Sequence, residues 1–339
     1  MEPNKINTGL DIDKQEIEQQ LPEKRLMGVG SFWPVILKNK GDYVKIWNEL
    51  APETQFGRLV ETMGCTGYGF DNIVEMLWLY QYGIKMNISD RAMNKMSGTT
   101  QQGNTVDAPP DTFRKKGFLL EEEWPWDREK FTWAEYYKTI PSDLLAKALK
   151  RTEEWGLEHE YVPNNPDAMI NALNTGPLGG TVYAWSKGSD GIYRDYGNRA
   201  NHFTVVILDY EYGKYWICGD SYPDDFQYND NPQQPEFIKK LAWNYNFGCI
   251  KRYRLIDKRS DKTTNLTLLA KLKNMFKNLQ AYMDSHGLHI WYVEETRGKQ
   301  EIFLETIAEK ALFMSYVKER IIRTTSFSKL NIYPNFKFF

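Results

Sequence analysis

Apolar residues recur at helical spacing directly after Cys65. Phe70, Ile73 and Leu77 follow one another at intervals of three and four residues, which predicts one buried face of an α-helix. Gly83 stands where a glycine commonly ends a helix. The sequence therefore predicts a helix whose N-terminus lies at or near Cys65.

β-branched and aromatic residues dominate a later part of the chain. Runs of such residues, separated by Gly, Asp and Asn, predict the strands of an antiparallel sheet. They are TVYAW (181–185), HFTVVILDY (202–210), KYWICGD (214–220) and CIKRYRLI (249–256). Because the predicted helices come first and the strands second, we expect an α+β fold with a helical lobe and an antiparallel β-sheet or barrel lobe.

The first 50 residues are predicted to form an N-terminal arm and lead-in. Residues 12–21 are compatible with a helix but carry few apolar side chains, so we expect a peripheral element. Apolar residues, glycines and a proline mix between 27 and 50, which predicts loops and short strands. Further short helices are expected at 110–116 and 167–176.

The pattern changes at the end of a predicted main domain, 51–257. A polar linker opens a C-terminal appendage, 258–339, of mixed α/β character. Its amphipathic helix, 266–283, either packs on the rest of the protein or docks on a partner protein in a larger assembly. A strand at 289–295 and a helix at 302–321 are expected to follow.

Composition narrows the possible partners. The chain has 339 residues, of which 26% are charged, and a formal net charge of −2, so no nucleic-acid partner is expected. No apolar run approaches the ~18 residues of a membrane span, and the N-terminus lacks the apolar run of a signal peptide. Three cysteines are too few for a disulfide framework, which favours a reducing, cytoplasmic location.

Three residues form a candidate thiol site. Cys65 at a helix N-terminus would have its thiolate stabilised by the helix dipole. His202 opens an apolar strand, and Asp220 ends the next strand, so the two side chains can lie side by side. Such a carboxylate would orient the imidazole, which would act as base toward the thiol. The alternatives are a buried structural cysteine and a histidine at a strand edge.

From Pro52 to Ile256 the chain resembles the papain-like cysteine peptidases. Six segments match that family in order: CTGYGFDNIVEML (65–77), ISDRAMNKMSG (88–98), KKGFLLEEEWPW (115–126), TGPLGGTVYAW (175–185), GIYRDYGNRANHFTVVILDY (191–210) and GDSY (219–222). The second of them resembles the loop that follows the family's long helix. The segment QFGRLVETMGCTGYGFDNIVE (55–75) is most similar to versions encoded by tailed bacteriophages, which would allow a virion-associated location.

The resemblance implies a role for each site residue. Cys65 is the expected nucleophile, His202 the base and acid, and Asp220 the orienting residue in place of the family's asparagine. This replacement keeps an acceptor for the imidazole and adds a negative charge. Gln55, ten residues before Cys65, is the expected oxyanion-hole donor, or else a plain loop glutamine. No metal or organic cofactor is required.

Other positions depart from the family. Gly103 is a single glycine where the family offers a pair that binds the substrate backbone, and Tyr222 replaces a tryptophan beside the catalytic histidine.

Two candidate functions follow from the predicted site and its departures from the family. The first is a cysteine peptidase or amidase acting on a peptide or protein through a thioester, or an acyltransferase that resolves the thioester differently. The second is a structural or binding module of a larger assembly, such as a phage particle, with an idle site.

Overall fold

The computed structural model describes most of the first 259 residues and three strands beyond them. The described ranges are 9–18, 41–50, 54–183, 186–222, 237–259, 290–296, 299–304 and 330–334. The chain divides into two compact units, Met1–Arg259 and Ser260–Phe339.

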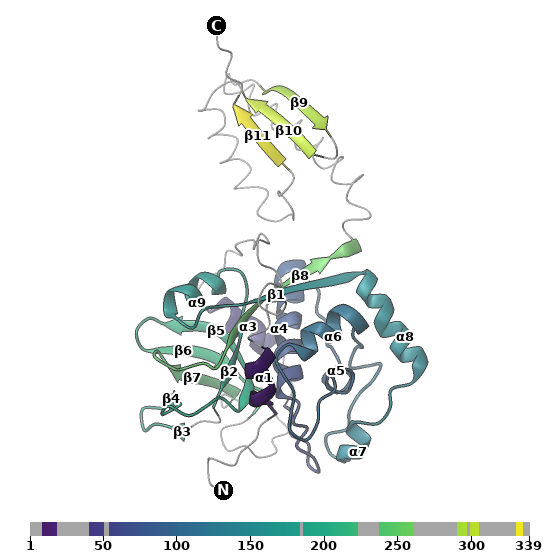
Figure 1. The fold of residues 1–339 in the computed structure, drawn as a ribbon, viewed down its shortest axis with the longest axis vertical. Helices are drawn as coiled ribbons and strands as arrows, with labels where there is room; N and C mark the ends of the chain where they lie inside the picture. The colour runs from purple at the N-terminus through teal and green to yellow at the C-terminus, as the bar shows by residue number, and fades with distance from the viewer. Residues whose placement is uncertain are drawn as a thin grey trace. The chain divides into compact units, whose positions relative to one another are not determined.

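The first unit combines helices with one large sheet. Its helices are α1 (Ile12–Glu18), α3 (Asp42–Leu50), α4 (Cys65–Tyr82), α5 (Asp90–Ser97), α6 (Ala108–Lys116), α7 (Trp133–Tyr136), α8 (Ser142–Lys150), the 3₁₀ turn η2 (Arg151–Glu153) and α9 (Pro166–Leu173). Its strands are β1 (Trp155–Tyr161), β2 (Leu178–Val182), β3 (Ser186–Lys187), β4 (Tyr193–Arg194), β5 (His202–Glu211), β6 (Tyr215–Gly219), β7 (Ile238–Ala242) and β8 (Ile250–Asp257). In Figure 1, α5 to α8 lie on one side, β2 to β7 with α9 on the other, and α4 between them. The predicted α+β fold with two lobes is confirmed.

The sheet has eight strands in the order β1-β8-β2-β5-β6-β7-β4-β3. Its strand pairs are antiparallel apart from the parallel pair of β4 and β7. The strand β5 lies between β2 and β6, with His202 opposite Val182 and Val206 opposite Gly219. The end of β6, and with it Asp220, therefore lies beside the first half of β5.

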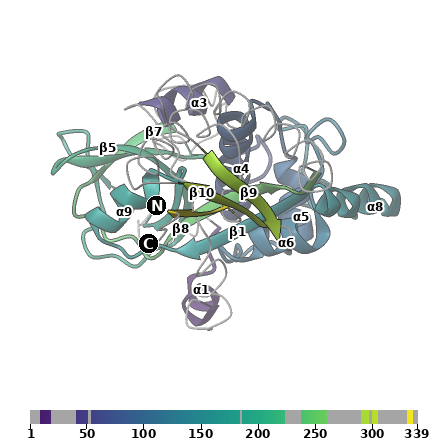
Figure 2. The same ribbon diagram turned by 90° about the horizontal axis from the view of Figure 1, so that it is seen from above.

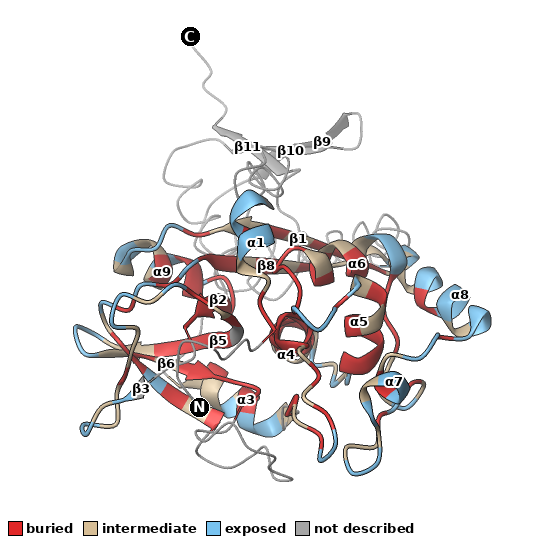
Figure 3. Cartoon of the chain, turned by 60° about the horizontal axis from the view of Figure 1, so that its bottom comes forward, coloured by how far each residue is buried: buried red, intermediate tan, exposed pale blue. Residues whose placement is uncertain are grey.

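Helix α4 forms the centre of the unit. Every residue from Cys65 to Trp78 is buried, and Figure 3 shows this helix enclosed by the surrounding elements, whereas α8 is largely exposed. Gly83 has a φ of 66°, and its N–H donates to the carbonyl of Leu79, which ends the helix as the sequence predicted. A buried helix of this kind holds Cys65 in a fixed position.

Two helices differ from the sequence expectation. Residues 42–50 form α3, where loops and short strands were expected, because Tyr43 and Trp47 lie one turn apart and are both buried. Helix α5 was not predicted, although Ser89 accepts a hydrogen bond from the N–H of Ala92 at its start. Polar and apolar residues are both buried along it, so no clear apolar period marks this helix. The buried residues are Asp90, Arg91, Ala92, Met93, Asn94 and Met96.

The second unit contributes a three-stranded sheet. Its strands are β9 (Ile290–Thr296), β10 (Lys299–Leu304) and β11 (Leu330–Pro334), in the order β11-β10-β9. β9 confirms the predicted strand, whereas residues 302–304 belong to β10, so the helix predicted from 302 is wrong there. The helix predicted at 266–283 lies outside the described residues. No helix in the described ranges is long and apolar enough to cross a membrane.

Candidate active site

The turn before α4 holds Cys65 rigidly. Met63 has a positive φ of 52°, and Gly64 precedes the first helical residue. A Cβ added at Gly64 or Gly67 would lie 2.4 Å from the amide of Asn94 on α5, so only glycine leaves room for this side chain. The Cys65 side chain, at the helix N-terminus, is fully buried.

His202 and Asp220 form a buried pair at the ends of two neighbouring strands. The imidazole Nε2–H donates to Asp220 Oδ1 at 2.9 Å, and neither side chain is exposed. The same oxygen accepts the backbone N–H of Ser221 at 2.8 Å. With its proton on Nε2, the imidazole has its basic lone pair on Nδ1.

Tyr222 connects this pair to the cysteine. Its ring contacts the His202 ring edge-on, with 4.8 Å between centroids. Tyr222 and Ala200 also belong to the apolar cluster that contains Cys65. Burial raises the pKa of Tyr222 well above its ordinary value, and the nearby Glu61 and Cys65 add to the rise. The structure therefore gathers the predicted Cys65, His202 and Asp220 around one tyrosine ring.

Gln55 is buried against the segment that follows Asp220. Its Nε2 donates to Glu61 Oε1 at 2.8 Å and to the hydroxyl of Tyr222, and its Oε1 accepts from Ser221 Oγ at 2.7 Å. Burial raises the pKa of Glu61 to about 7, although bonds from Gln55, Met63 and Tyr222 oppose the rise. Gln55 thus lies at the site, with its amide group engaged on both sides.

Residues 9–18, which we term the N-terminal segment, lie over the nucleophile. Gly9 and Asp11 exchange backbone hydrogen bonds with Asn104, at 2.9 and 3.0 Å. A Cβ added at Gly9 would lie 3.0 Å from Cys65 Sγ. Leu10 is 3% exposed and belongs to the same apolar cluster as Cys65. The loop at Gly103, which the resemblance assigns to the substrate backbone, therefore contacts the chain's own backbone.

A buried polar network fixes the same segment further along. Gln15 on α1 donates from Nε2 to the hydroxyl of Tyr161 at 3.0 Å and accepts the backbone N–H of Val106 at 2.7 Å. The Tyr161 hydroxyl donates in turn to Asp107, which also forms an ion pair with Lys251. Burial lowers the pKa of Lys251, and the attraction of Asp107 opposes this.

The peripheral location expected for this segment is wrong in part. Figure 2 shows α1 at an edge of the first unit, away from α3, but Leu10 and Gln15 are buried. The segment looked peripheral because its few buried side chains are surrounded by charged ones. Backbone pairing and one amide side chain, which no apolar pattern records, hold it in place.

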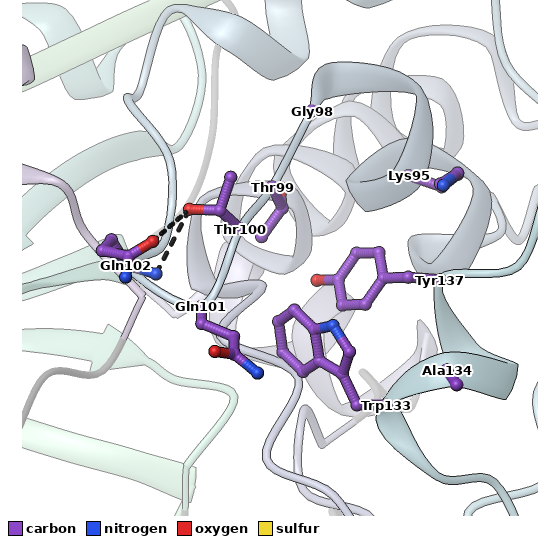
Figure 4. A pocket seen from close by; sticks show the side chains of 9 residues that line it. All are labelled: Lys95, Gly98, Thr99, Thr100, Gln101, Gln102, Trp133, Ala134 and Tyr137. Carbon is purple, nitrogen blue, oxygen red and sulfur yellow. Dashed lines mark hydrogen bonds between the residues drawn. The ribbon is translucent and has the colours of Figure 1, made fainter.

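A hollow of about 570 Å³ lies on the helical lobe next to the loop at 99–103. Figure 4 shows the rings of Trp133 and Tyr137 facing this loop. The residues that line it are Lys95, Gly98, Thr99, Thr100, Gln101, Gln102, Trp133, Ala134 and Tyr137. The Tyr137 hydroxyl donates to the carbonyl of Thr62, just before Cys65, at 2.6 Å. The hollow therefore adjoins the segment that leads to Cys65.

Of the remaining cysteines, Cys218 lies in the core of the β-sheet lobe, whereas Cys249 belongs to the same apolar cluster as Cys65. Burial raises the pKa of Cys218 well above its ordinary value, and Asp220 adds to the rise. Burial also raises the pKa of Cys249 to about 12. Both thiols are therefore protonated at neutral pH and provide internal references for Cys65. Within the described residues, His, Cys, Asp and Glu side chains form no group of three able to hold a metal ion.

No family model and no curated protein matches the chain. Among solved structures it is similar to digestive procathepsin L 3 of Tenebrio molitor larval midgut, with 14% identity, coverage of 73% of this chain and 76% of that one, and a TM-score of 0.46. The proform of the ragweed pollen allergen Amb a 11, a cysteine protease, gives 14% identity, coverage of 72% and 76%, and a TM-score of 0.42. A Carica candamarcensis cysteine protease in complex with E-64 gives 15% identity, coverage of 58% of this chain and 86% of that one, and a TM-score of 0.41. The chemistry of the site therefore rests on its own residues.

The structure adds residues that the sequence did not indicate. Glu61 binds Gln55, and its carboxylate Oε1 also accepts the backbone N–H of Met63 at 2.8 Å. Lys239 on β7 places its Nζ 3.2 Å from Asp220 Oδ2. Lys239 and Leu241 are two residues apart on β7 and both are buried, whereas Lys240 between them is exposed. This period of two was the sequence signal that Lys239 lies on the buried face of its strand. Nothing in the local sequence distinguishes Glu61.

Proposed function

We propose that the protein is a papain-like cysteine peptidase or amidase in which Cys65, His202 and Asp220 act together. The observation that carries this proposal is the buried His202–Asp220 pair, whose imidazole contacts the same tyrosine ring that packs near the thiol of Cys65. An acid held at 2.9 Å from Nε2 fixes the tautomer that makes Nδ1 the base.

The reaction has two steps. His202 takes the proton of Cys65, and the thiolate attacks the carbonyl carbon of an amide. When the tetrahedral intermediate collapses, the C–N bond breaks and the imidazolium gives its proton to the leaving amine. Water, deprotonated by His202, then attacks the thioester and releases the acid and the free thiol. No external oxidant or metal is needed for this balance.

The proposed oxyanion donors are the backbone N–H groups in the first turn of α4 and the side chain of Gln55. The Gln55 amide now donates to Glu61 and Tyr222. It must therefore exchange one of these bonds for a bond to the substrate. Protonation of Glu61 weakens the hydrogen bond that its carboxyl group accepts from Gln55. Gln55 is therefore released more readily from Glu61 than from Tyr222.

Substrate access requires the N-terminal segment to leave. Cys65 is fully buried, and the segment already fills the contacts at Asn104 that a peptide backbone would make. The same closure supports the second candidate function, a papain-fold module of a larger assembly such as a phage particle, with an idle site. In that case residues 258–339 would provide the contact with a partner protein.

Labelling by an electrophilic thiol probe near neutral pH tests the enzyme proposal. We expect Cys65 to react faster than Cys218 and Cys249, and His202→Ala to slow its reaction without changing the melting temperature greatly. Peptide mass spectrometry assigns the label to each cysteine, and Cys65→Ala is the control for probe selectivity. Because the N-terminal segment covers Cys65, the decisive comparison uses Leu10→Ala as the background, which weakens that closure. Equal reactivity of the three thiols in this background, together with no effect of His202→Ala, would show that the site is idle.

A further inference from the structure

A lysine lies behind the His202–Asp220 pair. Lys239 is on β7 opposite Cys218 of β6, and its side chain is completely buried. The ammonium lies 3.2 Å from Asp220 Oδ2 and donates a hydrogen bond to the backbone carbonyl of Tyr222. Lys239 therefore holds both the carboxylate and the chain segment that carries the aromatic neighbour of His202.

Burial makes the charge of each group depend on the other. An isolated ammonium or carboxylate costs several kcal/mol to bury, whereas an ion pair with further hydrogen bonds offsets much of that cost. The two oxygens of Asp220 have different partners: Oδ1 accepts from His202 and from the N–H of Ser221, and Oδ2 faces Lys239. The imidazole therefore contacts a carboxylate whose charge a lysine balances.

Lys239 balances the negative charge that the sequence predicts next to His202. That prediction followed from aspartate in place of the family's asparagine at position 220. Together, Asp220 and Lys239 carry no net charge, yet Oδ1 still accepts the Nε2–H of His202. In electrostatic terms the pair therefore resembles the neutral amide that the family uses.

Four other titratable side chains lie near the Asp220–Lys239 pair and His202 among the described residues. They are Cys218 on β6, Cys65 at the start of α4, Tyr222, and Glu61 in the loop before α4. Cys218 and Tyr222 remain neutral near pH 7 because burial raises the pKa of each well above its ordinary value. The other two are Cys65, the proposed nucleophile, and Glu61, whose pKa burial raises to about 7.

We propose that Lys239 is a positioning residue that neutralises and orients Asp220 and thereby sets the protonation of His202. The proposal rests on the proposed role of His202 as the base for Cys65. Without Lys239, the full charge of Asp220 would stabilise the imidazolium, and His202 would remain protonated to higher pH. A lysine that only fills space would have no such effect.

The experiment is an NMR titration of the His202 ring in the full-length chain. Cys65→Ala and Glu61→Gln form the background, because they remove the thiol and the carboxyl group from the neighbourhood of the imidazole. Lys239→Met is expected to move the His202 titration midpoint up by roughly 1–2 pH units. Lys239→Arg should leave the midpoint close to that of the background. His202→Ala assigns the resonance among the four histidines of the chain.

The double variant Asp220→Asn/Lys239→Met provides the matched control. It replaces an ion pair by two neutral side chains, so its midpoint should return to that of the background and its stability should exceed that of Asp220→Asn alone, which leaves a buried lysine without its carboxylate. If Lys239→Met does not fold, the double variant and Lys239→Arg still decide the question. An unchanged midpoint in Lys239→Met, or a double variant that still shifts it, would overturn the proposal. Because the titration needs no turnover, it is independent of the probe-labelling test of the enzyme.

Discussion

Replacement of Leu10 by alanine should expose the nucleophile. Leu10 is 3% exposed and packs in the apolar cluster that contains Cys65, whereas Cys65 itself is fully buried. A reagent therefore reaches the thiol only when the N-terminal segment opens or the protein unfolds. Leu10→Ala weakens the closed state without altering any residue proposed to take part in the reaction.

The size of the effect follows from the burial of this side chain. Full burial of a leucine contributes about 1.5–3 kcal/mol, and alanine retains only part of it. Taking a loss of about 2 kcal/mol, the population of the open state rises about 30-fold. When opening and closing are fast compared with labelling, the rate at Cys65 should rise by the same factor.

The assay is the labelling rate of each cysteine with a small neutral alkylating reagent, followed by peptide mass spectrometry. Cys218 reports global unfolding within the same sample, since it is buried in a different apolar cluster. Cys249 belongs to the cluster of Leu10 and Cys65 and is therefore not used as this reference. Leu145→Ala on α8 is the matched control, because Leu145 is 41% exposed and its loss should not affect Cys65.

Two results would refute this reasoning. The first is an unchanged Cys65 rate in Leu10→Ala, which would mean that the segment does not limit access. The second is an equal acceleration of Cys65 and Cys218, which would mean that the substitution destabilises the whole unit and does not open the segment locally.

Three further predictions concern single positions. The pKa of Glu61 is about 7 in the folded state against an ordinary value of 4.5, so the folded state binds more protons than the unfolded state between these pH values. The free energy of unfolding should therefore fall by at most ~3 kcal/mol as the pH rises from 4.5 to 7. Urea unfolding of Glu61→Gln should lack this dependence on pH. Gly219→Ala should lower the melting temperature, since its Cβ would lie 2.6 Å from the Trp47 ring, and an unchanged value would contradict this close approach. Gly103→Ala, with a φ of +91° and a Cβ 2.1 Å from the Gly9 carbonyl oxygen, should loosen the N-terminal segment, and equal rates of limited proteolysis within that segment would argue against it.

The sequence indicated the central helix and the strands of the site because their signals are local. Apolar spacing and Gly83 define α4, and alternation of β-branched and aromatic residues defines β5 and β6. The hydrogen bond between His202 and Asp220 also follows from local order, since a short hairpin makes their strands neighbours. Whether these residues perform catalysis stays a prediction.

What the sequence did not indicate depends on contacts between distant segments. Helix α5 buries Arg91, whose guanidinium donates to the carbonyls of Pro125, Glu135 and Tyr136, so a charged residue does the work that a pattern assigns to apolar ones. Lys239 is recognisable as a partner of the site only once β7 is placed beside β6. Periodicity can place such a residue on the buried face of its element, but its partner is set by tertiary structure.

The Gln15 amide gives the N-terminal segment a single alignment on the rest of the first unit. It offers a donor to Tyr161 and an acceptor to the N–H of Val106 at the same time. A shift by one residue would bring Lys14 or Glu16 to this place, and each ionised side chain supplies only donors or only acceptors. An unmet buried polar group costs about 1–3 kcal/mol. The position of Gln15 therefore fixes the register of the whole segment, and with it the position of Leu10 near Cys65.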